Sequence, residues 1–248
     1  MKRTLSLMFL TLAVVVGLSM TAFAQNTILF NQVNANSNGS AYGDSTGLYD
    51  GALNGTPTEF VCDDSHTTIT AGEWWTAQVT SWSNLTTGKY PGVNSGGVFN
   101  SFTIPGGSSF TPTQSQAYMM MGWLALQIFN NPTNAGGAWT ADSAAIWALM
   151  DNPSGGVAGG PPGTLTDLDN AYTAVITGGL TTAYFAAQGL VIYTPESGPS
   201  NDASPTCSAG VDCGQEFIAK TPEPLSMVLM GTFLTLAGLG LGKKKLSS

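Results

Sequence analysis

Two uncharged apolar segments, one near each end of the chain, limit the part that can fold as a water-exposed body. The first, LSLMFLTLAVVVGL, follows two basic residues and is too short to span a membrane comfortably. It is followed by the small residues Ala22 and Ala24 in an A-x-A pattern. A basic start, a short apolar run and such a site form a secretory signal. We therefore predict that signal peptidase removes residues 1–24 and that the exported chain begins at Gln25.

The second apolar segment runs from Leu225 to Gly242 and contains no charged residue. Its length is near the lower limit for a helix that crosses a membrane, and glycines are tolerated there better than in water-soluble helices. Lys243, Lys244 and Lys245 follow it. The positive-inside rule keeps these lysines in the cytoplasm and leaves the body on the other side. We predict a transmembrane helix over this segment.

Pro222, Glu223 and Pro224 stand directly before the second apolar segment. A Pro-Glu-Pro motif, an apolar helix and a basic cluster, in this order at the end of an exported chain, resemble the PEP-CTERM sorting signal of Gram-negative bacteria. The resemblance covers residues 221–248. It implies that an exosortase-like membrane protease cleaves near the motif, after the tail has held the chain transiently at the inner membrane. It also implies a final location at the cell surface or outside the cell, associated with exopolysaccharide or biofilm.

Residues 25–220 remain for the body, which is enough for one domain with a hydrophobic core. They contain 14 acidic and two basic residues. Nucleic-acid binding requires the opposite charge, so we expect no nucleic-acid partner. Cys207 and Cys213 flank a short loop and are candidates for a local disulfide, because an exported chain meets oxidising conditions. A pairing of Cys62 with either of them stays open.

The pattern of apolar and turn residues predicts an α+β fold, with a β-rich sandwich or barrel body and a helical insert. Residues 70–82 alternate as a strand does, which places Trp75, Ala77 and Val79 on one face. Late strands are predicted within residues 189–195 and 215–224.

Three helices are predicted between these strands, within residues 112–132, 140–153 and 164–179. Asn-Asn-Pro ends the first of them. Thr140 or Asp142 is the expected N-cap of the second, and Thr166 that of the third. Gly178 supplies the stop of the third helix.

The body also resembles bacterial Cys-Gln thioester domains, which have a β-barrel with an inserted helical part. FVCDD at 60–64, an apolar helix around residues 120–128 and SAAIWALMD at 143–151 follow the order seen there. In that family a cysteine bonds to the glutamine of a T-Q-x-A motif just before Ile-Trp. Cys62 has the cysteine position, but Ser143 stands where the glutamine is expected. A serine cannot supply the acyl half of a thioester, so the resemblance implies a related fold that has lost the reactive bond.

No pattern in the body identifies an active site. His66 is the only histidine, and Asp63 and Asp64 beside it lack the spacing of a calcium-binding loop. Four tryptophans are expected in the core rather than on a sugar-stacking platform: Trp74, Trp75, Trp82 and Trp123. We expect a non-enzymatic surface or matrix protein without cofactor or metal. The alternatives are a thioester-type surface adhesin that uses Cys62, and a secreted polysaccharide hydrolase.

Replacement of Glu223 by alanine, or deletion of Lys243–Lys245, is expected to prevent removal of the tail, because each change destroys one part of the sorting signal. The intact mass of the chain recovered from the cell surface measures this, and the wild-type mass should end near Pro222. Ser247→Ala, which lies outside all three parts, serves as the control. Unchanged processing of both altered chains would contradict the prediction.

Overall fold

The computed structural model describes residues 26–37, 39–63, 65, 69–85, 99–150, 156–195 and 215–220. The predicted signal peptide, the sorting motif with its tail, and Cys207 and Cys213 lie outside these residues. Within the described ranges, no helix has the length and apolar character that a membrane crossing requires.

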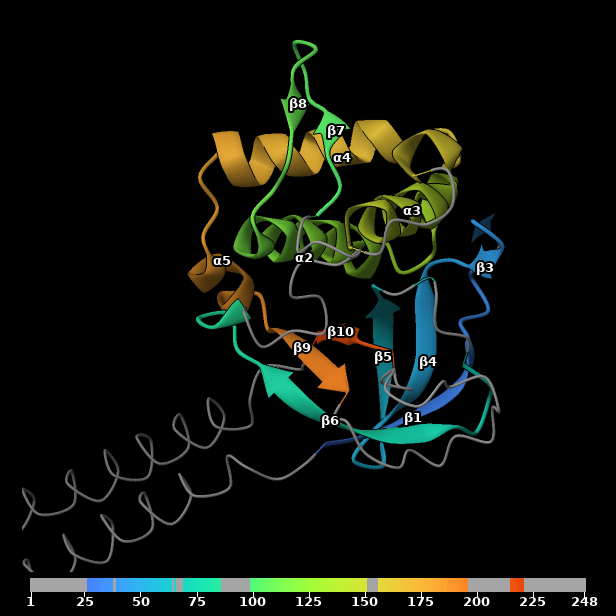
Figure 1. Cartoon of the computed structure of the whole chain (residues 1–248). Coiled ribbons are helices and arrows are strands. Elements are labelled where there is room, and N and C mark those ends of the chain that lie inside the picture. Colours follow the sequence, from blue (N-terminus) through green and yellow to red (C-terminus); the bar gives the residue numbers. More distant parts are fainter. Residues whose placement is uncertain are drawn as a thin grey trace, which may run out of the picture.

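Six antiparallel strands close into a barrel in the order β1-β4-β5-β10-β9-β6 (Figure 1). Their bounds are β1 (Asn26–Val33), β4 (Leu48–Leu53), β5 (Thr56–Cys62), β6 (Trp74–Thr80), β9 (Leu190–Pro195) and β10 (Phe217–Lys220). Two short ribbons stand apart from the barrel, β2 (Ser40–Ala41) with β3 (Asp44–Ser45), and β7 (Phe102–Thr103) with β8 (Ser109–Phe110). The predicted α+β class is confirmed, and the body is a barrel rather than a sandwich.

The barrel strands alternate between an interior face and an outer face that the helices cover. Phe60, Cys62 and Phe217 belong to the interior cluster, whereas Val61 and Ile218 pack with the helices. This is the period of two that an extended strand imposes. Successive residues of β5 and β10 therefore face different environments.

Strand β6 confirms most of the predicted alternation. Trp75 and Ala77 are buried in the barrel interior, as expected. Val79 is 52% exposed, because it lines an open hollow where the strand ends. Val79 still lies on the same face as Trp75 and Ala77, because it is paired with the interior residue Tyr193.

The chain between β6 and β9 carries the helices, which lie in layers on one side of the barrel (Figure 1). They are α2 (Gln114–Asn130), α3 (Ala138–Met150), α4 (Thr164–Tyr172) and α5 (Thr182–Ala187), with the short turns η2 (Ala135–Gly137), η3 (Gly156–Gly159) and η4 (Thr173–Thr177). Helices α2 and α3 supply many of the buried apolar side chains. The expected helical insert is thus present.

The helix ends match the sequence prediction only in part. Helix α2 begins with a capping box between Thr113 and Gln116. It ends at Asn130, the first residue of the Asn-Asn-Pro sequence. Thr140 and Asp142 are not N-caps, because α3 already begins at Ala138. Thr166 is not one either, because α4 begins at Thr164. The side chain of Asn134, in the turn before α3, accepts the Trp139 N–H, whereas Gly163 before α4 provides no side-chain cap.

Asp142 is buried where α3 packs against α4, with 5% of its surface exposed. Burial and, to a lesser extent, the nearby carboxyl of Asp167 together raise the pKa of its carboxyl to about 8. Burial also raises the pKa of Asp167. Loss of the Asp142 proton would place a charge in a buried position next to another carboxyl.

We expect the free energy of unfolding to fall as pH rises from about 4 to about 8, because unfolded aspartate ionises near pH 4 while folded Asp142 keeps its proton up to about pH 8. Above about pH 8, the contribution of Asp142 to the free energy of unfolding no longer changes with pH. Asp142→Asn removes this pH-dependent contribution. The free energy of unfolding of the variant, relative to that of the wild type, should therefore increase as pH rises. Urea unfolding at pH 5 and pH 8 measures the difference. An equal difference at both pH values would contradict the assignment.

Candidate functional site

Cys62 is the last residue of β5 and faces the barrel interior, with 1% of its surface exposed. Its backbone is paired with Phe217 of β10. The indole N–H of Trp147, a buried residue of α3, donates to the Cys62 carbonyl at 3.0 Å. The helical layer therefore holds the end of β5 directly at the cysteine.

Gln215 lies two residues before the first residue of β10 and is 5% exposed. The Cys62 thiol donates to its Oε1 at 3.1 Å. These two residues are 153 positions apart in the sequence. A buried thiol thus lies in contact with a buried carboxamide, whose carbonyl carbon is an electrophile that a thiolate can attack.

The residues that follow each of these two are acidic and fully buried. Asp63 comes after Cys62, and Glu216 comes after Gln215, both with 0% exposure. Tyr118 of α2 donates to Glu216 Oε1 at 2.6 Å, and Thr194 of β9 donates to Glu216 Oε2. The surroundings of the thiol and carboxamide are therefore built from specific polar contacts within an otherwise apolar core.

The glutamine that contacts Cys62 is Gln215, which is far in sequence from the predicted position 143. Ser143, at the position expected for the glutamine, instead accepts the backbone N–H of Gly47 at 2.9 Å. Gly47 has a φ of +103°, a left-handed conformation that glycine adopts without strain. Gln215 was treated only as the start of a late strand. The conclusion that the glutamine is absent does not hold for the structure, because the closing strand brings Gln215 to Cys62.

Of the other candidates from the sequence, Asp63 directly follows Cys62 in the chain. Asp64 and His66 lie outside the described residues, and Asp63 is buried rather than part of a solvated turn. Trp75 and Trp82 are buried as predicted, whereas Trp74 is 38% exposed. In the part of the chain that the structure describes, no group of three or more His, Cys, Asp or Glu residues could hold a metal ion.

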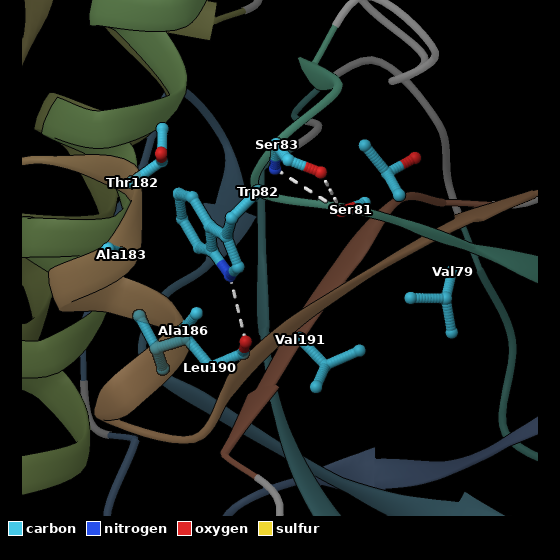
Figure 2. A pocket seen from close by; sticks show the side chains of 10 residues that line it. Val79, Ser81, Trp82, Ser83, Thr182, Ala183, Ala186, Leu190 and Val191 are labelled. Atoms are coloured by element: carbon cyan, nitrogen blue, oxygen red, sulfur yellow. Dashed lines mark hydrogen bonds between the residues drawn. The ribbon is translucent and has the colours of Figure 1, made fainter.

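A hollow of about 420 Å³ opens between the end of β6, α5 and the start of β9 (Figure 2). Trp82 stands in its wall and donates its indole N–H to the Leu190 carbonyl at 2.8 Å. The described lining residues are Val79, Thr80, Ser81, Trp82, Ser83, Thr182, Ala183, Ala186, Leu190 and Val191. None of them is ionisable, so they supply no acid or base. The pair of Cys62 and Gln215 is the better candidate for chemistry.

Comparison with known proteins adds little to this geometry. No protein-family model matches the chain, and no curated protein matches it. One solved structure that matches is the N-terminal thioester domain of the fibronectin-binding protein SfbI from Streptococcus pyogenes. The match covers 81% of this chain and 93% of that one, with 12% identity and a TM-score of 0.36. A similarity of this extent assigns neither a fold nor a function to this chain.

Ser143→Ala is expected to lower the free energy of unfolding by about 1–3 kcal/mol, because it leaves the buried Gly47 N–H without its acceptor. It should leave the environment of Cys62 unchanged. Denaturant unfolding measures the loss. Ser115→Ala, at an exposed position of α2, is the control and should change stability by less than about 0.5 kcal/mol. Equal stability of the two variants would contradict the role assigned to Ser143.

Proposed function

We propose that Cys62 and Gln215 form an internal thioester, through which the chain attaches covalently to a partner that carries a primary amine. The observation that carries this proposal is the 3.1 Å contact between the Cys62 thiol and Gln215 Oε1. Two such groups held together by a folded protein react as an effectively intramolecular pair.

The chemistry requires no cofactor. The Cys62 sulfur attacks Cδ of Gln215, the C–N bond breaks, and ammonia leaves with the proton that the thiol gives up. A partner amine then attacks the same carbon, and the C–S bond breaks. The partner becomes bound to Gln215 through an amide, and the Cys62 thiol is regenerated. Each chain reacts once, so it serves as an attachment protein and not as an enzyme.

The surroundings of the pair support this proposal. Cys62 and Gln215 are 1% and 5% exposed, and exclusion of water protects a reactive acyl group from hydrolysis. The hydrogen bond from Trp147 holds the cysteine end. Export and surface presentation, which we propose from the signal sequence and the sorting tail, would bring this group to amines on a host surface or in the extracellular matrix.

The other functions have less support among the described residues. A polysaccharide hydrolase requires two carboxylates beside the sugar. The hollow beside Trp82 has the tryptophan but no carboxylate in its described lining. Association with exopolysaccharide is compatible with the thioester, since a matrix component that carries amines would be a partner for it.

The intact mass of the exported chain, expressed with its own signal sequence and tail, tests the thioester. We expect a mass lower by one ammonia than the sequence predicts, and a gain of one methylamine after incubation with that amine. Cys62→Ala and Gln215→Ala should each abolish both effects. Gln78→Ala, at an exposed position of β6, is the matched control and should retain both. A wild-type chain of full mass, with a Cys62 thiol that alkylating reagents modify once the chain is unfolded, would overturn the proposal.

A further inference from the structure

Glu216 is a fully buried acidic residue next to Gln215, and it faces away from the barrel interior. Phe217 and Ala219 belong to the interior cluster, whereas Ile218 packs with the helices. By the same alternation Glu216 faces the helices, where it meets Tyr118 of α2. Gln215 has the opposite orientation and meets Cys62, which also belongs to the interior cluster.

Two structural elements contact the Glu216 carboxyl group directly, and a third contacts one of its partners. Tyr118 of α2 donates to one oxygen at 2.6 Å, and Thr194 of β9 donates to the other. The Thr194 hydroxyl also shares a hydrogen bond of 2.5 Å with that of Thr80, at the end of β6. The three partner side chains are also buried. The carboxyl group is therefore held from both sides by hydroxyl groups of fixed position.

Such a buried polar cluster is not needed for stability alone. Removal of a carboxyl group from water is costly, and well-packed apolar side chains of similar size often stabilise a core at least as well. What the cluster does supply is a fixed orientation. β10 has only four residues, and Gln215 precedes the first of them. A hydrogen-bonded Glu216 prevents this strand end from rotating about its own axis.

We propose that Glu216 is a positioning residue for thioester formation, and that it acts through Tyr118 and Thr194. This inference rests on the proposed function of Cys62 and Gln215. With its side chain fixed against α2 and β9, the strand turns the preceding carboxamide toward the Cys62 sulfur. The cysteine end is held by the Trp147 bond from α3. Neighbouring helices α2 and α3 thereby set the positions of both reactive groups.

Reactions between held groups are sensitive to small displacements. A shift of about 1 Å in the position of one group can slow such a reaction by about 100-fold. Loss of one hydroxyl of the cluster should therefore slow ammonia release by about 10-fold to 100-fold while the barrel remains folded.

Tyr118→Phe is the central test, because it removes one hydroxyl and keeps the ring. The matched control is Tyr49→Phe, which removes the bond of 2.5 Å from another buried tyrosine to the Ser45 carbonyl. The full-length chain is recovered unfolded, with Gln215 still a carboxamide, and is then refolded and sampled by mass spectrometry, so that the rate of ammonia loss is followed directly. We expect slow formation in Tyr118→Phe and the wild-type rate in Tyr49→Phe. Thermal unfolding of both variants shows whether their stabilities are matched.

Two substitutions of Glu216 separate positioning from packing. Glu216→Gln keeps an acceptor for one hydroxyl and should restore part of the rate that Glu216→Leu loses. Wild-type rates in Tyr118→Phe and Glu216→Leu would overturn the inference and leave the thioester intact. Equal slowing in Tyr118→Phe and Tyr49→Phe would also overturn it, because the effect would then follow general destabilisation. A wild-type chain that never loses ammonia would overturn the proposed function itself.

Discussion

The pairing of β10 between β5 and β9 is the contact on which the rest of the structure depends. This strand of four residues closes the barrel through ladders to both neighbours. Its first residue, Phe217, is paired with Cys62 and stacks with Trp75 in the barrel interior. A closed barrel has no free edge, so the same contact that completes the fold also removes two unpaired strand edges. It also brings Gln215 to the cysteine.

The helices hold the two chain segments of the barrel that carry Cys62 and Gln215. Trp147 of α3 binds the backbone of Cys62, and Tyr118 of α2 binds the side chain that follows Gln215. Both residues also belong to the apolar cluster that the helices share with the outer face of the barrel. The same two residues therefore stabilise the apolar core and hold the segments that carry Cys62 and Gln215. For a protein that forms the proposed thioester, this double role explains why the helical insert packs on β5, β9 and β10.

Local patterns predicted much of the fold. The alternation in β6 and the continuous apolar character of α2 gave the correct type of element, because strand and helix periods appear in neighbouring residues. The starts of α3 and α4 were predicted wrongly, because the Asn134 side chain accepts an N–H at the start of α3 and Gly163, without a capping side chain, precedes α4. Val79 continues the predicted face of Trp75 and Ala77, but it is exposed because it lines the open hollow at the end of the strand.

The sequence by itself determined the class of the fold, the strands β6, β9 and β10, the helices α2, α3 and α4, and Cys62 as a residue of interest. It also predicts export and sorting, because the signal sequence and the sorting tail are each defined by residues that are neighbours in the sequence. Only the tertiary structure decided which residue meets Cys62. That contact spans 153 positions and depends on the register of β10 against β5, which no short pattern encodes. Ser143 was favoured by its neighbours in sequence, but Gln215 lies at the cysteine because the barrel closes there.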